Sequence, residues 1–222
     1  MLRGTGCSWK KCAFCDYHLD FSTNTSENFL LNKEVLSKVT GCYGILEVDN
    51  CGSFTELDSS TMEEIKRVCV EKKITKIHFE CHWNNRDKIA GLKESFSKLG
   101  ITAKVKCGAE TFDIPFREYV MNKGIGIDVG AKELSSFFDE CILLFGLKGQ
   151  SKESMIYDIE TSLANFERVY VNVMCDNSAV LKPDASTVEI FYKEILPLLE
   201  NNERADVFTD NLDFSQEEIQ IL

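Results

Sequence analysis

The sequence predicts an α/β protein in which parallel strands alternate with helices. Three observations support this fold class. Short apolar runs of strand length recur along the chain, longer stretches with helical periodicity lie between them, and polar residues follow each apolar run. Such alternation is typical of βαβ units, and their right-handed crossovers curl a parallel sheet into a barrel or an open fan. We therefore expect six β/α units in one curled sheet.

The apolar runs place the six strands in chain order. They are expected at residues 2–4, 43–48, 76–79, 102–107, 141–145 and 169–173. The helices are expected where apolar residues recur every three to four positions, at residues 33–38, 61–72, 86–99, 114–122, 152–166 and 186–199. Capping residues support three of them, because Ser59 or Ser60 can begin the second helix, Ser151 can begin the fifth, and Gly100 can end the third.

The length and composition favour one domain that acts on a small molecule. The chain has 222 residues, three prolines and no Gly/Ser-rich linker, so we expect a single domain over residues 1–222. Its formal net charge of -11 argues against a stable nucleic-acid partner, because non-specific binding to phosphates relies on clustered Lys and Arg. A local basic pocket around Lys148 and Lys182 stays open.

The start of the chain and its apolar content indicate a compartment. The first residues, MLRGTGCSW, contain no charged-then-apolar leader, and no apolar run approaches the roughly 20 residues of a membrane span. We therefore expect a cytoplasmic protein with no membrane partner, in which the ten cysteines are kept reduced.

Three cysteines near the start, Cys7, Cys12 and Cys15, form a CxxxxCxxC pattern that can bind one metal cluster. Three thiolates can hold three irons of a 4Fe-4S cluster, and without a fourth Cys one iron is left open. Disulfides, half of a zinc site and buried thiols are the alternatives. A zinc site normally adds a second CxxC or a His pair, which this chain lacks, so the cluster is favoured.

Polar residues follow the predicted strands, at the edge where parallel barrels place functional side chains. The first strand runs into the cysteine loop, and the other five are followed by DNCGS at residues 49–53, ECHWNN at 80–85, GAET at 108–111, GLKGQ at 146–150 and NVMCDN at 172–177. Any one of them is explained as an ordinary polar turn, but their recurrence after every strand indicates a site.

The cysteine pattern resembles the signature of the radical S-adenosylmethionine (radical SAM) superfamily, CxxxCxΦC with an aromatic Φ. Cys7, Cys12, Phe14 and Cys15 match it apart from one extra residue between the first two cysteines. The resemblance implies a partial (β/α)6 barrel of the radical SAM type, a 4Fe-4S cluster and S-adenosylmethionine as cofactors, and an electron donor such as flavodoxin or ferredoxin. One electron would cleave the sulfur–C5′ bond of S-adenosylmethionine, and the resulting 5′-deoxyadenosyl radical would take a hydrogen from the substrate.

By the same resemblance, the turn after the second strand holds the cofactor. The glycine-pair motif of the superfamily corresponds to residues 51–53, so Asn50, Gly52 and Ser53 are expected to bind S-adenosylmethionine, with Ser53 at a position where Glu is common. Phe14 is expected as an apolar wall of this site. Glu110 is expected at the ribose hydroxyls, since a carboxylate can accept hydrogen bonds from two hydroxyls at once.

The stretches DNCGSF and ECHWNN are similar to those of the queuine lyases, which release the 7-deazaguanine base queuine from queuosine or its 5′-phosphate. This resemblance implies the radical fragmentation of a modified nucleoside. The expected base-binding side chains are polar groups near the strand ends: Asn84, Asn85, Asn172, Asp176 and Asn177. The expected catalytic residues are Glu80, His82 and Lys148, of which His82 can exchange a proton near neutral pH. Lys148 or Lys182 could also bind a phosphate group of the substrate through its positive charge.

Two alternatives stay open. One is a radical SAM enzyme that modifies an RNA nucleobase or another small metabolite, although the acidic balance counts against RNA. The other is a non-catalytic iron-sulfur electron carrier, which would have no need of the polar strand ends.

Cys51 and Cys81 also stand near strand ends, and we expect them to be packing residues rather than participants in radical chemistry.

Overall fold

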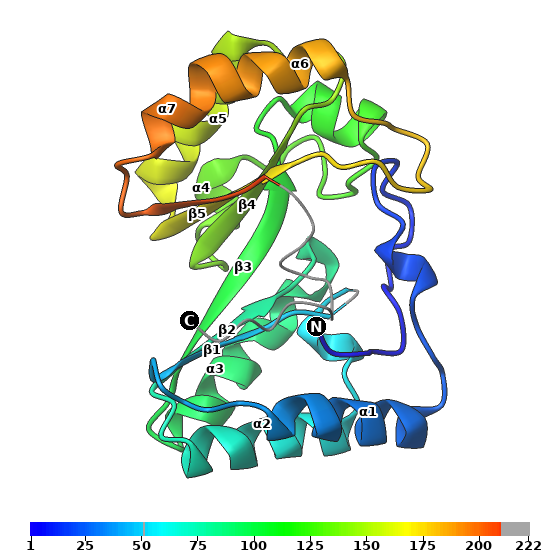
Figure 1. The fold of residues 1–222 in the computed structure, drawn as a ribbon, viewed down its shortest axis with the longest axis vertical. Coiled ribbons are helices and arrows are strands. Elements are labelled where there is room, and N and C mark those ends of the chain that lie inside the picture. The colour runs from blue at the N-terminus through cyan, green and yellow to red at the C-terminus, as the bar shows by residue number, and fades with distance from the viewer. Residues whose placement is uncertain (51, 210–222) are drawn as a thin grey trace. The chain divides into compact units, whose positions relative to one another are not determined.

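Parallel strands alternate with helices along the chain, as predicted (Figure 1). The structure is a computed structural model that describes residues 1–50 and 52–209. The chain divides into two units. The first consists of Met1–Lys11, Asp16–Gly108 and Ser136–Asp139, and the second of Cys12–Cys15, Ala109–Ser135 and the chain from Glu140 onwards. The expectation of one domain over residues 1–222 stays a prediction, and Cys51 lies outside the described residues.

The first unit holds three parallel strands and three helices. Its strands are β1 (Ile45–Val48), β2 (Lys76–Glu80) and β3 (Thr102–Glu110), and the last two residues of β3 belong to the second unit. Its helices are α1 (Thr25–Ser37), α2 (Ser59–Glu71) and α3 (Ile89–Ser97), with the 3-10 turns η1 (Tyr17–Leu19), η2 (Phe54–Glu56) and η3 (Trp83–Lys88). The register pairs Val48 with Phe79 and Glu80 with Lys106.

The strands of the first unit have one apolar and one polar face, because side chains alternate along a strand. Ile77, Phe79 and Val105 are fully buried, and Phe79 packs on Phe96 of α3 with the ring centroids 5.4 Å apart. The helices therefore cover the apolar face. Charged side chains such as that of Lys106 occupy the opposite face.

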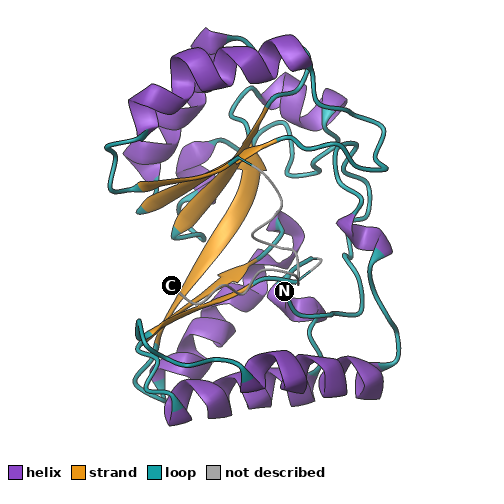
Figure 2. Cartoon of the chain, in the orientation of Figure 1, coloured by secondary structure: helices purple, strands orange, loops and turns teal. Residues whose placement is uncertain are grey.

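The second unit repeats this arrangement (Figure 2). Its strands are β4 (Glu140–Phe145), β5 (Arg168–Val173) and β6 (Ala205–Phe208), all parallel. Its helices are α4 (Ala131–Leu134), α5 (Lys152–Asn165), α6 (Ala185–Ile190) and α7 (Leu196–Leu199), with the π-helical turns η4 (Phe116–Val120) and η5 (Phe191–Ile195). Phe145 of β4 packs on Phe191 with the ring centroids 6.0 Å apart, so the apolar side of these strands also faces helices.

Two strand predictions are corrected by the structure. Residues 2–4 form no strand, because only Leu2 makes a bridge, to Asn50. The strand β6 was not expected, since ADVF is short and offers only two strongly apolar residues. The order of strands in the sheet is the order in the chain, β1 to β6.

The helix boundaries differ where capping residues or proline decide them. The first helix begins at Thr25, well before residue 33, because the Asn24 side chain accepts the Glu27 N–H at 3.2 Å. Asp58, rather than Ser59 or Ser60, caps α2 by accepting the Thr61 N–H at 2.8 Å. The region expected as one helix at 186–199 is continuous but contains η5 and a proline at the start of α7.

The caps expected at Ser151 and Gly100 are confirmed. Ser151 accepts the Ser154 N–H at 3.2 Å at the start of α5, and Gly100 has a φ of +74° just after α3. The helices expected at residues 61–72 and 152–166 correspond to α2 and α5. Across residues 1–50 and 52–209, no helix is both long and apolar enough to cross a membrane.

Candidate cofactor site

The first half of the cysteine loop, residues 7–11, belongs to the first unit and is attached to Glu56. The Ser8 N–H donates to Glu56 Oε1 at 2.6 Å, and the Thr5 N–H donates to the Glu56 carbonyl at 2.8 Å. Cys7 lies between these two attachment points and is half-buried. Gly6 has a φ of +102°, a left-handed conformation that favours glycine. The backbone around Cys7 is therefore held on both sides.

The turn after β1 packs against this half of the loop. The Gly52 N–H donates to the Asn50 carbonyl at 2.7 Å, and Asn50 Nδ2 donates to the Ser53 carbonyl at 3.0 Å. A Cβ at position 52 would overlap the Glu56 carboxylate and would lie 3.0 Å from the Cys7 Cα. Asn50 is buried, and no described protein group donates to its Oδ1. Gly52 thus permits a close approach to Cys7, and Asn50 offers a buried acceptor beside it.

Three predicted site residues meet in the first unit: Ser53, His82 and Asn85. The hydroxyl of the fully buried Ser53 accepts the His82 N–H at 2.9 Å and a hydrogen bond from Asn85 Nδ2 at 3.2 Å. The His82 ring stacks on Trp9 of the cysteine loop with the centroids 5.6 Å apart. The predictions therefore converge on the loop, although the Ser53 hydroxyl already has two protein partners.

His82 and Asn84 also have structural roles. His82 caps η3, because its Nδ1 accepts the Asn84 N–H at 3.2 Å. The Asn84 residue is exposed. Trp83 between them is buried and packs at right angles on Phe137, with the ring centroids 5.5 Å apart.

A buried lysine that the sequence did not single out joins the carboxylates on the polar face of the first unit. Lys106 Nζ lies 3.9 Å from Glu80 Oε1 and 3.6 Å from Asp49 Oδ1, and it also donates to Glu47. Its side chain is 2% exposed, whereas that of Glu80 is 34% exposed. Burial lowers the pKa of Lys106, but the carboxylates of Glu80, Asp49 and Glu47 outweigh it and raise the pKa above its ordinary value. The lysine therefore stays charged among these three carboxylates.

The second half of the cysteine loop, Cys12–Cys15, belongs to the second unit and is held through its backbone. The Ala13 N–H donates to the Met121 carbonyl at 2.9 Å, and the Ala13 carbonyl accepts the Leu181 N–H at 2.8 Å. Asn177 Nδ2 donates to the Phe14 carbonyl at 2.9 Å. Asn177, expected to bind the base, therefore supports the loop.

Glu110 and Phe14, both expected at the cofactor, are connected by Lys123. Lys123 Nζ lies 2.6 Å from Glu110 Oε1 and 5.6 Å from the centroid of the Phe14 ring. Glu110 is buried and has a φ of +65°, which is rare for a residue with a side chain and points to local strain. Lys123 was missed because nothing in the run MNKG distinguishes it from a solvated lysine.

A further buried carboxylate belongs to Asp158 of α5, which bonds to the segment directly after β3. Its Oδ1 accepts the Phe112 N–H at 2.6 Å. Burial raises the pKa of Asp158 to about 6, against the opposing effect of its hydrogen bonds from Phe112 and Thr111.

The remaining predicted residues lie elsewhere in the second unit. Lys148 is exposed in the turn after β4, and Asn172 is half-buried in β5. Asp176 is exposed and pairs with Lys182 at 3.1 Å, and Lys182 also donates to the carbonyl of Asn177.

The chain was compared with known proteins. No protein-family model and no curated protein matches it. Among solved structures, it is similar to the queuine lyase from Clostridium spiroforme bound to SAM and queuine, with 39% sequence identity, a TM-score of 0.90 and coverage of 96% of this chain and 91% of that chain. The chain belongs to the queuine lyase family.

Queuine lyases are radical SAM enzymes, and the expected partial-barrel fold class, the 4Fe-4S cluster and S-adenosylmethionine are confirmed by this membership. The alternative of a non-catalytic electron carrier is thereby set aside. Streptococcus suis SuiB shares the fold, with 14% identity, a TM-score of 0.57 and coverage of 94% of this chain and 48% of that chain. SuiB bound to S-adenosylmethionine gives 15% identity, a TM-score of 0.56 and coverage of 100% and 52%.

The cysteines of this queuine lyase family member fall into two chemical classes. The nine described cysteines carry thiols rather than disulfides. Burial raises the pKa of Cys69 to about 11. The pKa of Cys81 is raised even more, first by burial and then by the charge of Cys107. Both shifts disfavour the thiolate, which is the form that binds metal. The loop cysteines, by contrast, are half-buried. Their thiols fit the donor set of an iron-sulfur cluster, whereas the buried ones are packing residues, as expected for Cys81.

The three loop cysteines are divided between the two units of the chain. Cys7 belongs to the first unit, and Cys12 and Cys15 belong to the second, where the Cys15 N–H donates to the Cys12 carbonyl at 3.4 Å. Within residues 1–50 and 52–209, no group of three His, Cys, Asp or Glu side chains is arranged to hold a metal ion. The assignment of Cys7, Cys12 and Cys15 as cluster ligands accordingly stays a prediction.

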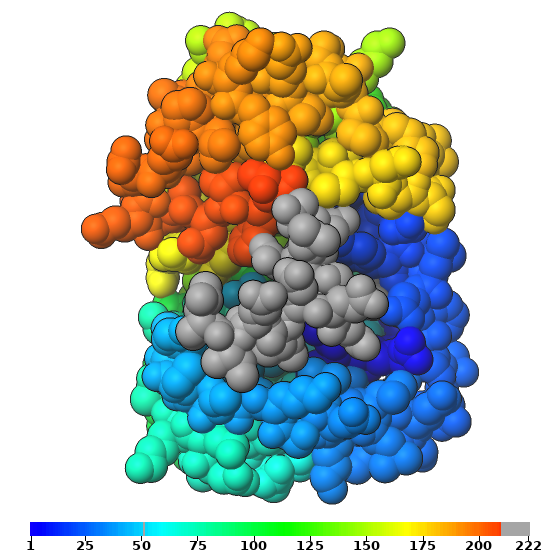
Figure 3. Space-filling model, in the orientation of Figure 1, coloured from blue at the N-terminus to red at the C-terminus, as the bar shows by residue number. Residues whose placement is uncertain are grey.

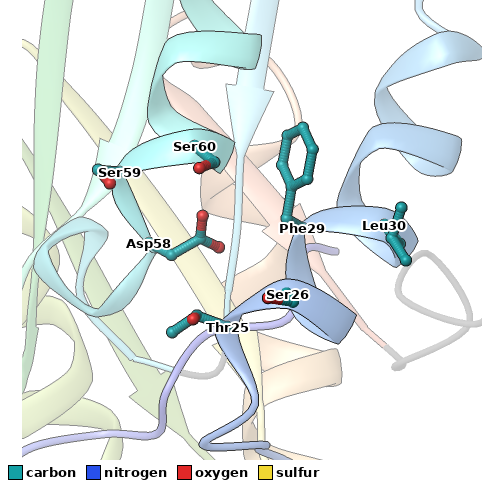
Figure 4. Close-up of a pocket in the computed structure, with 7 residues that line it drawn as sticks. All are labelled: Thr25, Ser26, Phe29, Leu30, Asp58, Ser59 and Ser60. Carbon is teal, nitrogen blue, oxygen red and sulfur yellow. The ribbon is translucent and has the colours of Figure 1, made fainter.

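A cavity of about 480 Å³ lies in the first unit, at the first turns of α1 and α2 (Figure 4). Its lining consists of Thr25, Ser26, Phe29, Leu30, Asp58, Ser59 and Ser60. None of the residues expected from the sequence to bind a ligand is among them. The α1 residues of this region lie at the surface, where Leu30 is 67% exposed (Figure 3).

Proposed function

We propose that this enzyme releases the base queuine from queuosine or queuosine 5′-phosphate. One observation carries the proposal: the chain is 39% identical, over 96% of its length, to a queuine lyase whose solved structure contains SAM and queuine. The acidic balance of the chain, with a net charge of -11, favours a free nucleoside over RNA as the substrate. We propose that a small external protein such as flavodoxin or ferredoxin delivers the electron.

The proposed ligands of the cluster are Cys7, Cys12 and Cys15. With S-adenosylmethionine bound, the cluster supplies one-electron cleavage of the cofactor and hence hydrogen abstraction from the substrate. Gly52 leaves room beside Cys7, and the buried Oδ1 of Asn50 is an acceptor suited to an amino group. Glu110 is the proposed acceptor for the ribose hydroxyls.

The polar face of the first unit suits a ligand rich in hydrogen-bond donors. The Glu47, Asp49 and Glu80 side chains are 39%, 21% and 34% exposed, while Lys106 beneath them is 2% exposed. A guanine-like base presents N–H donors at one edge, and carboxylates accept such bonds well. We propose Glu80 as an acceptor for the base. His82 stacks on Trp9 of the cysteine loop and Asn85 bonds to the Ser53 hydroxyl, so both stay candidates for the site, and Lys148 stays a candidate for the phosphate.

The substrate proposal is tested by anaerobic incubation of the reconstituted, reduced enzyme with S-adenosylmethionine and one of several substrates. The panel contains queuosine, queuosine 5′-phosphate, guanosine and a tRNA that carries queuosine. We expect mass spectrometry to detect free queuine from one or both of the first two substrates and no free base from guanosine. Release from the tRNA alone would support the RNA alternative, and release from none would contradict the proposal.

A further inference from the structure

We propose that Glu56 is the positioning residue that sets Cys7 for cluster binding. The proposal rests on the assignment of Cys7 as an iron ligand made under the proposed function. Glu56 ends η2, directly after the turn at residues 52–53, and is 7% exposed.

Glu56 connects the segment at residues 5–8 with the turn at residues 52–53 through four acceptor contacts. Its Oε1 accepts the Ser8 N–H at 2.6 Å, and its Oε2 accepts the Ser53 N–H. Its carbonyl accepts the Thr5 N–H at 2.8 Å and the Thr5 hydroxyl at 3.1 Å. Cys7 therefore lies between two residues that are both attached to Glu56.

The surroundings of Glu56 leave little room for another arrangement. A Cβ at Gly52 would overlap its carboxylate, and a Cβ at Gly4 would lie 2.9 Å from its carbonyl oxygen. A buried carboxylate is destabilised unless it is hydrogen-bonded, and bonds from N–H groups to a charged acceptor are stronger than neutral ones. Gly52 and the two N–H donors thus surround the Glu56 carboxylate, and Gly4 adjoins the Glu56 carbonyl.

The attached segment opens a loop that contains one residue more than the superfamily spacing. Ser8 is fixed by Glu56, and Trp9 stacks on His82. The chain then turns at Lys10, whose φ of +56° is left-handed. The backbone on either side of Cys7 is thus attached to Glu56, and functional groups must be held within about 0.5 Å to work.

The test is the variant Glu56→Gln, which places an amide NH2 where one of the two backbone N–H groups needs an acceptor. Glu64→Gln is the matched control, because Glu64 is 9% exposed and bonds to Arg67 on its own helix. Glu56→Asp keeps the charge but shortens the side chain by one methylene, so it should not satisfy both the Ser8 and the Ser53 N–H groups. It serves as the second variant if Glu56→Gln folds poorly.

Two measurements on purified protein report on Cys7. After anaerobic reconstitution, we expect about four irons per chain in the wild type and in Glu64→Gln, and at least twofold less in both Glu56 variants. In the metal-free proteins, we expect iodoacetamide to modify Cys7 at least about threefold faster in the Glu56 variants, as measured by peptide mass spectrometry, with Cys42 as the internal reference.

The outcomes separate this proposal from the one on which it rests. Wild-type iron content and Cys7 reactivity in both Glu56 variants would overturn the positioning role, as would equal losses in Glu64→Gln. A Cys7→Ala variant that still binds four irons would instead show that Cys7 is no ligand, whatever Glu56 does.

Discussion

The two halves of the cysteine loop are held by different means. Residues 7–11 depend on side chains, since the Glu56 carboxylate accepts the Ser8 N–H and the His82 ring stacks on Trp9. Residues 12–15 depend largely on backbone groups, since Ala13 bonds to the Met121 carbonyl and to the Leu181 N–H. Backbone contacts survive most substitutions, whereas side-chain contacts do not.

This difference indicates where the loop is sensitive to sequence. In the first half, one buried carboxylate and the glycine beside it determine the path of the chain. In the second half, Asn177 supplies one side-chain bond to Phe14, and several substitutions around it should be tolerated.

The largest expected effect is the loss of a proposed ligand from either half. Cys7→Ala and Cys12→Ala should each reduce 5′-deoxyadenosine formation to below about a hundredth of the wild-type rate, because three thiolates are needed for a site with one open iron. Iron content and product formation are measured together. Cys42→Ala, at an exposed thiol of the first unit, is the control and should keep both. A cysteine variant of either half that retains iron and activity would remove that half from the site.

The second prediction concerns the close packing of the first half. Gly52→Ala should destabilise the protein by about 2 to 3 kcal/mol, since its Cβ would overlap the Glu56 carboxylate. Gly91→Ala in α3 should stabilise it by about 0.5 to 1 kcal/mol, because nothing lies within 4 Å of that Cβ and alanine favours helix. Urea unfolding measures both. Equal effects of the two substitutions would show that Gly52 is not under steric constraint.

The third prediction uses the buried carboxylate of the second unit. Burial raises the pKa of Asp158 from its ordinary value of 3.8 to about 6 in the folded protein. The folded state therefore holds its proton more tightly, so this group favours folding below pH 4 and loses that contribution as the pH rises towards 6. We expect a loss of about 2 kcal/mol across this interval.

The check compares the wild type with Asp158→Asn by urea unfolding between pH 4 and pH 7. The difference in unfolding free energy between the two proteins should move in favour of the variant as the pH rises. A difference that is independent of pH would show that Asp158 titrates normally.

The smallest expected effect is in the second half of the loop. Asn177→Ala should cost about 1 kcal/mol of unfolding free energy through the lost bond to the Phe14 carbonyl. Asn84→Ala, at an exposed asparagine, should change the unfolding free energy by less than about 0.5 kcal/mol. If Asn177→Ala were as damaging as Gly52→Ala, the contrast between the halves would disappear.

The sequence predicted the alternating strands and helices because each is a local pattern. It did not predict β6, whose four residues are too few for a clear period, and it wrongly placed a strand at residues 2–4, where a single bridge forms. Helix starts depended on individual caps, as Asn24 and Asp58 show.

The candidate site was predicted where short motifs carry it and missed where distant residues meet. Lys106 pairs with Glu80 on the neighbouring strand, and Lys123 pairs with Glu110, which is 13 positions earlier in the chain. No local sequence pattern reveals such pairs. Lys106 stands between Val105 and Cys107 in the strand predicted at residues 102–107, which was nevertheless an available signal. The sequence also contains a signal for Glu56, because Ser53 and Glu56 form the S-x-x-E pattern of a capping box, which the structure contains.

We propose that this chain couples reductive cleavage of S-adenosylmethionine to release of queuine. The most direct measurement incubates the reconstituted enzyme anaerobically with reductant, S-adenosylmethionine and queuosine or its 5′-phosphate, and quantifies free queuine and 5′-deoxyadenosine in the same sample. We expect both products from the wild type and neither from Cys12→Ala. Queuine released without S-adenosylmethionine, or 5′-deoxyadenosine formed with no queuine from either substrate, would contradict the account.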